Sequence, residues 1–265
     1  MAVKKYILLF SGMLYKNMRE STSYKLDFVV GVLAHLIIQI SSLFCTIIVY
    51  NNVDTLGGFD FGECLILLGC YLLPTGIEEF FLHNVWSISK HVHSGSLDSY
   101  LTKPANTLFL LVMDGTNIHG FILTICGIFY LIFGIVNTNI YVGWWKFIWL
   151  IICVISGAFI IFSITVFMET LSFWFTEVTN ATVMIDSLRQ LVRYPITMFH
   201  PFLQKFLIFV VPYAYTSFFS ATLLFDLGKY MCYTYATPVV AMVMVMGAKK
   251  FFDFGLKNYS SPYGS

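Results

Sequence analysis

Charged residues are scarce in this chain. Of its 265 residues, 15 are Lys or Arg and 14 are Asp or Glu, only 11% of the sequence, whereas 58% of the residues are hydrophobic. Soluble domains carry about 25% charged residues, because their surfaces face water. The sequence therefore predicts a membrane protein whose solvent is largely lipid. A net charge of +1 supplies no basic surface, so no nucleic-acid partner is expected.

Chemical motifs are also missing. The six cysteines are scattered, and no pair has the spacing of a metal or redox motif, so we interpret them as small buried hydrophobic residues. The phosphate-binding pattern Gly-x4-Gly-Lys-Ser/Thr does not occur. His91 and His93 do not share a helix face, and no nearby Cys, Asp or Glu completes a metal site. We expect no catalytic residue, metal or bound cofactor in this chain.

The first 25 residues lack the features of a cleaved signal peptide. Their apolar run is short, no small-residue cleavage site follows it, and Lys16, Arg19 and Lys25 come after it. Segment 1–25 is therefore predicted to be an amphipathic helix lying on the membrane face.

Long apolar runs are abundant. A helix needs about 20 apolar residues to cross the hydrocarbon core. Such runs occur at 28–50, 61–82, 108–136, 146–168 and 231–247. Basic residues precede the first run, lie between the second and third, and follow the last, while the loops 51–60 and 137–145 contain none. By the positive-inside rule both termini are predicted to be cytoplasmic, which requires an even number of crossings, and six fits best.

The stretch 169–230 allows two interpretations. Either 206–225 is the fifth span and 176–205 is a cytoplasmic loop, or the more polar segment 172–193 crosses and three prolines break an external hairpin. Irregular backbone at membrane depth requires protein or a wet cavity around it. Both interpretations give six spans, and periodicity does not choose between them.

One polar island, residues 86–106, interrupts the apolar sequence. Within it, segment 96–101 is predicted to form a short helix with Leu97, Tyr100 and Leu101 on one face, ended by Pro104. Such an apolar stripe suits a groove on a soluble partner. The alternative is a connector that only reverses the chain direction.

A few ionisable or polar residues lie near membrane depth. Glu78 and Glu79 end the second span, where they face either a wet cavity or the headgroup region. Asp114 and Asn117 are three residues apart on the expected opening turns of the third span, so they are predicted to share a face and line a pathway.

Three passages together resemble the membrane subunits of ABC-2 type exporters. They are "SGSLDSYLTKPAN" in the island, "YPITMFHPFLQKFLIFVVPYAYTSFFSATLLF" and the tail "FFDFGLKNYSSPYGS". The resemblance implies one domain over 1–265: an all-α integral membrane protein with six transmembrane helices, an N-terminal interfacial helix, and an external or re-entrant Pro-broken hairpin at 195–225. It therefore favours 172–193 as the fifth span, with an Asp186–Arg189 ion pair on one side and Arg193 near the outer headgroups.

The resemblance also implies partners and a role for the island. A second permease chain, identical or related, would complete the pathway in the plasma membrane, among membrane lipids. Two ABC ATPase subunits, carrying ATP and Mg, would dock on 86–106, and the residues implied in docking are Leu97, Asp98, Tyr100, Leu101, Lys103 and Pro104. Two other functions stay open: a membrane-embedded enzyme acting on lipid-linked substrates, and a non-transporting immunity or sensor protein.

Overall fold

The structure, a computed structural model, describes residues 2–23 and 25–260, and every regular element within these ranges is helical. Residues 1, 24 and 261–265, at the ends of the expected domain and of the expected interfacial helix, lie outside the described residues. The long helices are α1 (Ala2–Ser23), α2 (Lys25–Tyr50), α3 (Phe61–Phe81), α7 (His119–Thr138), α8 (Trp144–Thr170) and α12 (Met231–Lys257). All of these except α1 contain a stretch long and apolar enough to cross a membrane.

Short helices fill the connections between the long ones. Between α3 and α7 lie η1 (His83–Ser87), α4 (Ile88–His93), α5 (Asp98–Leu101) and α6 (Thr107–Met113). Between α8 and α12 lie η2 (Leu171–Phe173), α9 (Thr179–Arg189), η3 (Gln190–Arg193), η4 (Ile196–Met198), α10 (Pro201–Lys205), η5 (Phe206–Val210), η6 (Tyr213–Tyr215), α11 (Phe218–Thr222) and η7 (Gly228–Tyr230).

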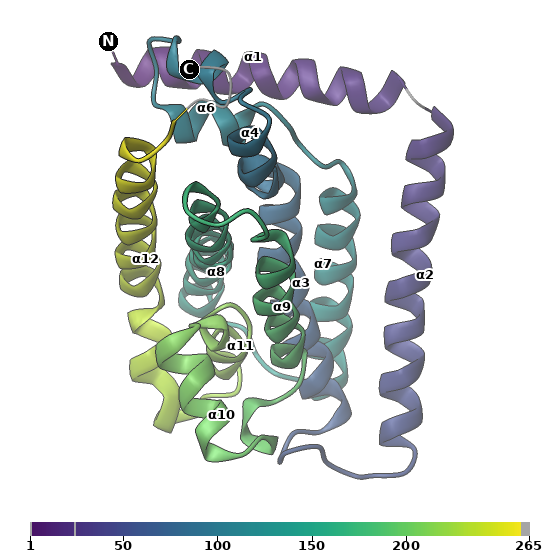
Figure 1. The fold of residues 1–265 in the computed structure, drawn as a ribbon. Coiled ribbons are helices and arrows are strands. Elements are labelled where there is room, and N and C mark those ends of the chain that lie inside the picture. The colour runs from purple at the N-terminus through teal and green to yellow at the C-terminus, as the bar shows by residue number, and fades with distance from the viewer. Residues whose placement is uncertain (1, 24, 261–265) are drawn as a thin grey trace.

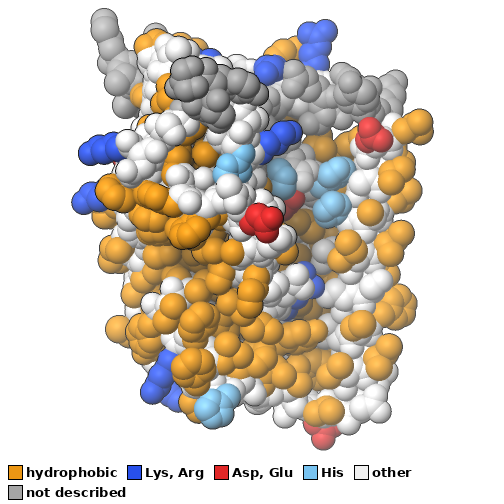
Figure 2. All heavy atoms as spheres, viewed as in Figure 1, with side chains coloured by type: hydrophobic (Ala, Val, Ile, Leu, Met, Phe, Trp, Pro, Cys, Tyr) orange, Lys and Arg blue, Asp and Glu red, His pale blue; other side chains and the backbone are white. Residues whose placement is uncertain are grey.

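The long helices form a bundle with distinct ends (Figure 1). Helix α1 lies across the upper end, where the island and the last turns of α12 also lie, and α10 and α11 lie at the opposite end. Hydrophobic side chains cover the middle of the face in Figure 2, and most charged side chains lie toward its two ends. This is the distribution that a protein crossing a bilayer needs.

The end opposite α1 is tied together by polar contacts. The Thr197 hydroxyl donates a hydrogen bond to the Gly57 carbonyl over 2.8 Å, joining the 51–60 loop to the hairpin region. Lys146, at the start of α8, lies 2.6 Å from the Asp226 carboxylate. At the start of α3, Asp60 and Glu63 form a capping box, which stabilises a helix beginning at this point.

Glycine spacing explains the closest helix contact in the bundle. Three glycines on α3 and three on α7 recur every seven residues and face one another: Gly62, Gly69, Gly76, Gly120, Gly127 and Gly134. A Cβ atom at Gly69 would lie 2.8 Å from the Leu131 nitrogen, and one at Gly76 would lie 2.6 Å from the Thr124 nitrogen. Only residues without a side chain allow the two backbones to approach this closely.

Helix α2 is attached more thinly. The Tyr130 hydroxyl of α7 donates to the Gln39 carbonyl over 2.7 Å, and the rings of His35 and His119 stack at 4.9 Å. Most large apolar side chains of α2 are exposed. Its outer face is therefore available to lipid or to a partner chain.

The third predicted span begins later than expected. The run 108–136 divides into α6, a non-helical linker at 114–118, and α7. Helix α6 belongs to the end of the bundle that carries α1, where Asn17 of α1 donates a hydrogen bond to the Met113 carbonyl. The expected continuous helix is wrong because α6 packs beneath α1 instead of continuing along α7.

The run 206–225 is not a straight span. Segments Pro201–Val210 and Tyr213–Thr222 form a pair bent by 82°. The side chains of Tyr213, Phe218 and Phe219 are fully buried, and the Ser217 hydroxyl donates to the Val192 carbonyl over 2.7 Å. Protein therefore surrounds the second segment of the pair, which is the condition for tolerating irregular backbone at membrane depth. The first segment is largely exposed, with Phe202, Phe209 and Val210 on its surface.

Candidate functional site

The island folds into a compact layer at the α1 end of the bundle (Figure 1). Leu97 is 0% exposed and Tyr100 is 5% exposed, because both pack into a cluster with Val85, Ile88 and Leu111 of the same chain. The prediction that these two residues form an apolar stripe open to a partner is therefore wrong. The pattern does mark a buried helix face, but the chain itself covers that face.

The longest continuous exposed segment of the island is 101–104, which we call the tip. Lys90, His93, Ser94, Ser96 and Ser99 of the island are also exposed. Leu101, Thr102, Lys103 and Pro104 are all exposed, whereas Asp98 is half-buried. Leu101 is 42% exposed, although it is a large apolar residue. The Lys103 ammonium lies 4.7 Å from the centre of the Tyr100 ring. The tip thus offers apolar and cationic groups side by side.

Asp114 fastens the island to its surroundings. The Tyr100 hydroxyl donates a hydrogen bond to the Asp114 carboxylate, and the Lys16 ammonium of α1 lies 3.7 Å from the same carboxylate. Burial, and secondly the hydrogen bond with Asp114, raise the pKa of Tyr100 above its usual value. Tyr100 therefore stays a hydrogen-bond donor to this carboxylate.

His91 packs against the other side of Tyr100. Its Nδ1 atom lies 2.7 Å from the Ser96 hydroxyl, and its ring meets the Tyr100 ring edge to face. Burial lowers the pKa of His91, and the neighbouring Lys90 lowers it further, while Asp114 acts in the opposite direction. Among the described residues, no group of three or more His, Cys, Asp or Glu side chains is arranged to hold a metal ion.

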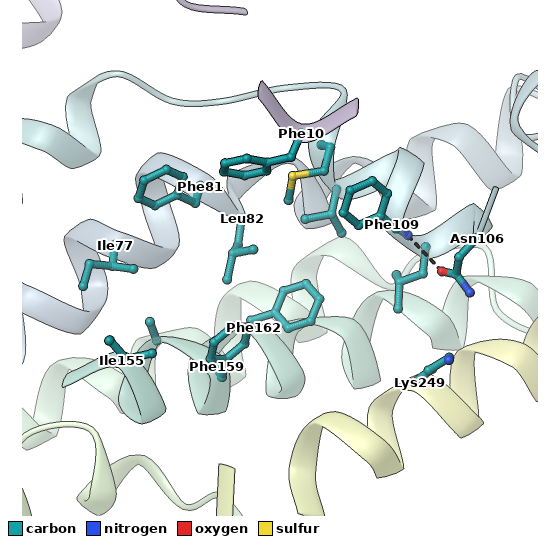
Figure 3. Close-up of a pocket in the computed structure, with 14 residues that line it drawn as sticks. Phe10, Ile77, Phe81, Leu82, Asn106, Phe109, Ile155, Phe159, Phe162 and Lys249 are labelled. Carbon is teal, nitrogen blue, oxygen red and sulfur yellow. Dashed lines mark hydrogen bonds between the residues drawn. The ribbon is translucent and has the colours of Figure 1, made fainter. Parts of the chain in front are cut away.

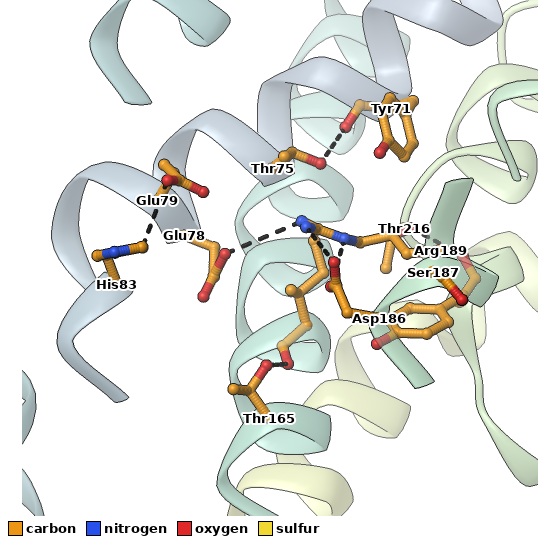
Figure 4. Close-up of polar contacts among 12 residues, drawn as sticks. Tyr71, Thr75, Glu78, Glu79, His83, Thr165, Asp186, Ser187, Arg189 and Thr216 are labelled. Atoms are coloured by element: carbon orange, nitrogen blue, oxygen red, sulfur yellow. Dashed lines mark hydrogen bonds and ion pairs between the residues drawn. The ribbon is translucent and has the colours of Figure 1, made fainter. Parts of the chain in front are cut away.

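A cluster of three charged side chains, which we call the charge cluster, joins α3 to α9 inside the bundle (Figure 4). The Arg189 guanidinium faces Asp186 with both Nε (2.9 Å from Oδ1) and Nη2 (3.1 Å from Oδ2). Its Nη1 lies 3.9 Å from Oε2 of Glu78, whose side chain is 1% exposed. The expected Asp186–Arg189 ion pair is present, and Glu78 joins it.

Arg193 also points into the protein. Its guanidinium lies 4.9 Å from the centre of the Tyr71 ring of α3, and the residue is half-buried. This cation–π contact holds Arg193 against α3, and its place near the outer headgroups stays a prediction.

Glu79 and Asn117 form a separate polar group near the end of α3. The Asn117 amide donates to Glu79 over 2.7 Å, and Nδ1 of His83 lies 3.3 Å from the same carboxylate. Asp114 and Asn117 both lie in the 114–118 linker, not on a helix, so the predicted shared helix face is wrong. The sequence makes six residues candidates for lining the pathway: Glu78, Glu79, Asp114, Asn117, Asp186 and Arg189. In the structure they fall into three groups: the charge cluster, the Glu79–Asn117 pair, and Asp114 with the island.

Comparison with known families agrees with this architecture. A family model described as ABC-2 family transporter protein matches residues 36–262, from within α2 to just past the last described residue. The chain belongs to the ABC-2 transporter family. Searches among curated proteins and among solved structures find no match. Membership identifies a multi-pass transmembrane permease of the ABC transporter class, which is a transport subunit and typically works with an ABC ATPase.

Sequence reasoning missed one residue that links this ABC-2 permease's island to its bundle. Glu169, in the last turn of α8, is fully buried, and its Oε2 atom accepts a hydrogen bond from the Ser89 backbone N–H of α4 over 3.1 Å. A carboxylate at the end of an otherwise apolar run was the available signal, because an ionisable group at this depth requires a partner. Through this bond the island is joined to α8 as well as to α3 and α7.

Proposed function

We propose that the chain is the membrane-spanning subunit of an ATP-driven exporter in the plasma membrane. Two permease chains, identical or related, form the pathway, and two separate ABC ATPase subunits bind ATP and Mg²⁺ and drive it. The observation that carries this proposal is the exposed apolar and cationic tip of the island, at the α1 end of an ABC-2 family bundle.

The proposed topology has six crossings, with both termini in the cytoplasm. Five crossings are the long apolar helices α2, α3, α7, α8 and α12. The other is α9 with η3, which is shorter than a typical span and packs inside the bundle, while α10 and α11 form the re-entrant hairpin. The basic side chains support this orientation. At the α1 end the described cations are Lys16, Arg19, Lys90, Lys103, Lys249, Lys250 and Lys257, whereas Lys146, Lys205 and Lys229 belong to the opposite end. In this topology α1 lies at the cytoplasmic membrane interface.

In this proposal the ATPase docks on the tip, and the buried residues of the island transmit its movement. Leu101, Lys103 and Pro104 would contact the ATPase directly. Leu97 and Tyr100 would act from inside the protein, by holding the tip against α6 and the 114–118 linker. The charge cluster would then be a joint between α3 and α9 that rearranges when access to the pathway switches.

Copurification tests the proposal. The tagged chain is expressed in its native host, solubilised in mild detergent, and its companions are identified by mass spectrometry. We expect an ABC ATPase in equal molar amount. A folded chain that carries no ATPase would refute the proposal and favour a membrane-embedded enzyme or an immunity protein.

A matched pair of variants tests the docking surface. Leu101→Glu should reduce the copurified ATPase at least tenfold without changing the amount of permease. Val53→Glu, at a 46% exposed apolar position in the 51–60 loop of the opposite end, should leave it unchanged. Equal ATPase recovery with both variants would show that the tip is not the docking surface. Leu97→Asp places a charge in a fully buried site, so it should lower the amount of folded permease itself.

A further inference from the structure

A cavity of about 540 Å³ lies between α1, α3, α6, α8 and α12 (Figure 3). Its walls are apolar, with aromatic rings from four elements: Phe10, Phe81, Phe109, Phe159 and Phe162. The volume falls within the range of about 300–1,000 Å³ typical of ligand sites. Two of its lining residues on α8, Ile155 and Phe159, are more than 40% exposed, so the cavity is open at the side of the bundle.

Two polar side chains stand at one end of this cavity. Asn106 and Lys249 are the polar residues of the lining, and Figure 3 shows both at the same side. The Asn106 side-chain oxygen Oδ1 accepts a hydrogen bond from the Phe109 N–H over 3.0 Å, so the side-chain NH₂ group remains as the donor. Lys249 is exposed. The polar end therefore consists of a donor and a cation, which suits an anionic group.

A second apolar groove adjoins the first. It has a volume of about 290 Å³, lies between α8 and α12, and is lined by Pro238, Met242 and Met246. Phe159 lines both cavities, so the two are neighbours along α8. One apolar cavity has a cationic end, and a second apolar groove lies beside it. Together they fit a molecule with two apolar tails and one anionic head.

We propose that these cavities bind one anionic phospholipid of the surrounding membrane. One acyl chain occupies the larger cavity, the other lies in the α8–α12 groove, and the phosphate meets Lys249 and Asn106. Apolar cavities do not hold water, so in a bilayer a lipid chain is the molecule able to fill a space open at the side. A lysine near a helix end reaches the headgroup level while its stem stays among the tails. The inference does not depend on what the permease exports.

Native mass spectrometry of the delipidated full-length chain tests this site. Phosphatidylglycerol and phosphatidylcholine with the same acyl chains are titrated separately. We expect one phosphatidylglycerol to bind more tightly than phosphatidylcholine, and Lys249→Gln to weaken phosphatidylglycerol binding about fivefold, the effect expected of one basic residue near an anionic lipid. The control is Lys250→Gln, which removes the neighbouring cation outside the cavity lining and should leave binding unchanged. An equal loss of phosphatidylglycerol affinity in Lys249→Gln and Lys250→Gln would overturn the proposal.

Filling the cavity gives an independent test. Ala158 is buried in the cavity wall, so Ala158→Leu should weaken the binding of both lipids. Photolabelling of the unmodified chain, using phosphatidylglycerol with a diazirine in one acyl chain, does not depend on any variant. We expect label on peptides containing 155–162 and 238–246. Label confined to α2 and α7 would overturn the proposal. Cavity peptides that stay unlabelled because a second copy of the chain covers them would also overturn it.

Discussion

Replacing Arg189 by methionine would test the charge cluster that joins α3 to α9. The cluster contains two carboxylates and one guanidinium, and the Arg189 side chain is only 10% exposed. Arg189→Met leaves Glu78 and Asp186 without their cation. Removing one partner of a buried ion pair costs about 3–5 kcal/mol, because the remaining charge is buried and uncompensated. We therefore expect Arg189→Met to be strongly destabilising.

Glu78→Gln should behave differently although it alters the same cluster. Asp186 approaches the guanidinium to 2.9 Å, whereas Glu78 is 3.9 Å away and 1% exposed, so Glu78 has the weaker attraction and the larger burial. Its replacement by a neutral residue of the same shape also balances the remaining charges. We expect Glu78→Gln to cost less than about 1 kcal/mol, and the double variant to be more stable than Arg189→Met alone.

Thermal unfolding in detergent distinguishes these outcomes. A change of about 1 kcal/mol shifts the midpoint of a chain near this size by about 2–4 °C, so Arg189→Met should lower it by roughly 6–20 °C and Glu78→Gln by at most a few degrees. Fluorescence-detected size-exclusion chromatography after heating measures all three variants. The charge-balance reasoning is refuted if Glu78→Gln lowers the midpoint as much as Arg189→Met, or if the two losses simply add.

Three further predictions concern packing and the island. Gly76→Ala should destabilise the fold by about 1–3 kcal/mol, because its Cβ would lie 2.6 Å from the Thr124 nitrogen. Gly12→Ala is the control in the same thermal assay, because a Cβ there meets nothing within 4 Å. Tyr100→Phe removes a hydrogen bond to a charged acceptor and should cost about 1.5–3 kcal/mol, whereas Tyr15→Phe at an exposed position should cost nothing measurable. Because burial lowers the pKa of His91, the folded island binds fewer protons than the unfolded chain, so its stability is present at neutral pH and falls as the pH drops below about 6.5. Protection factors of the amides of 88–101, which remove the intrinsic pH dependence of exchange, should be lower at pH 5.5 than at pH 7.5, and His91→Gln should remove this difference. A variant with the same fall in protection would contradict this assignment.

Apolar length was sufficient to predict most membrane helices. The runs 28–50, 61–82, 146–168 and 231–247 correspond to α2, α3, α8 and α12 within a few residues, except that α12 continues to Lys257. A single-span helix satisfies its own backbone, so its length and composition carry nearly all the information needed to recognise it.

Contacts between distant segments were not predictable in the same way. Asp186 and Arg189 are three residues apart, so helix geometry was sufficient to predict their ion pair. Glu78 is far away in the sequence, and its contact with Arg189 depends on how α3 and α9 pack. Asp114 likewise lies outside the helical pattern, where Tyr100 and Lys16 contact it. Periodicity identified the buried face of the island helix, but it contains no information on whether the covering surface comes from the same chain or from a partner.

The glycine-lined contact between α3 and α7 has a mechanical consequence. The island is the connection between these two helices, and their backbones are very close at the glycines. Sliding would drive side chains into the facing backbone, and separation would lose this close packing. A push on the island is therefore expected to move both helices together as one rigid unit. The thinly attached α2 and the bent hairpin between α9 and α12 are then the segments expected to shift relative to the α3–α7 pair.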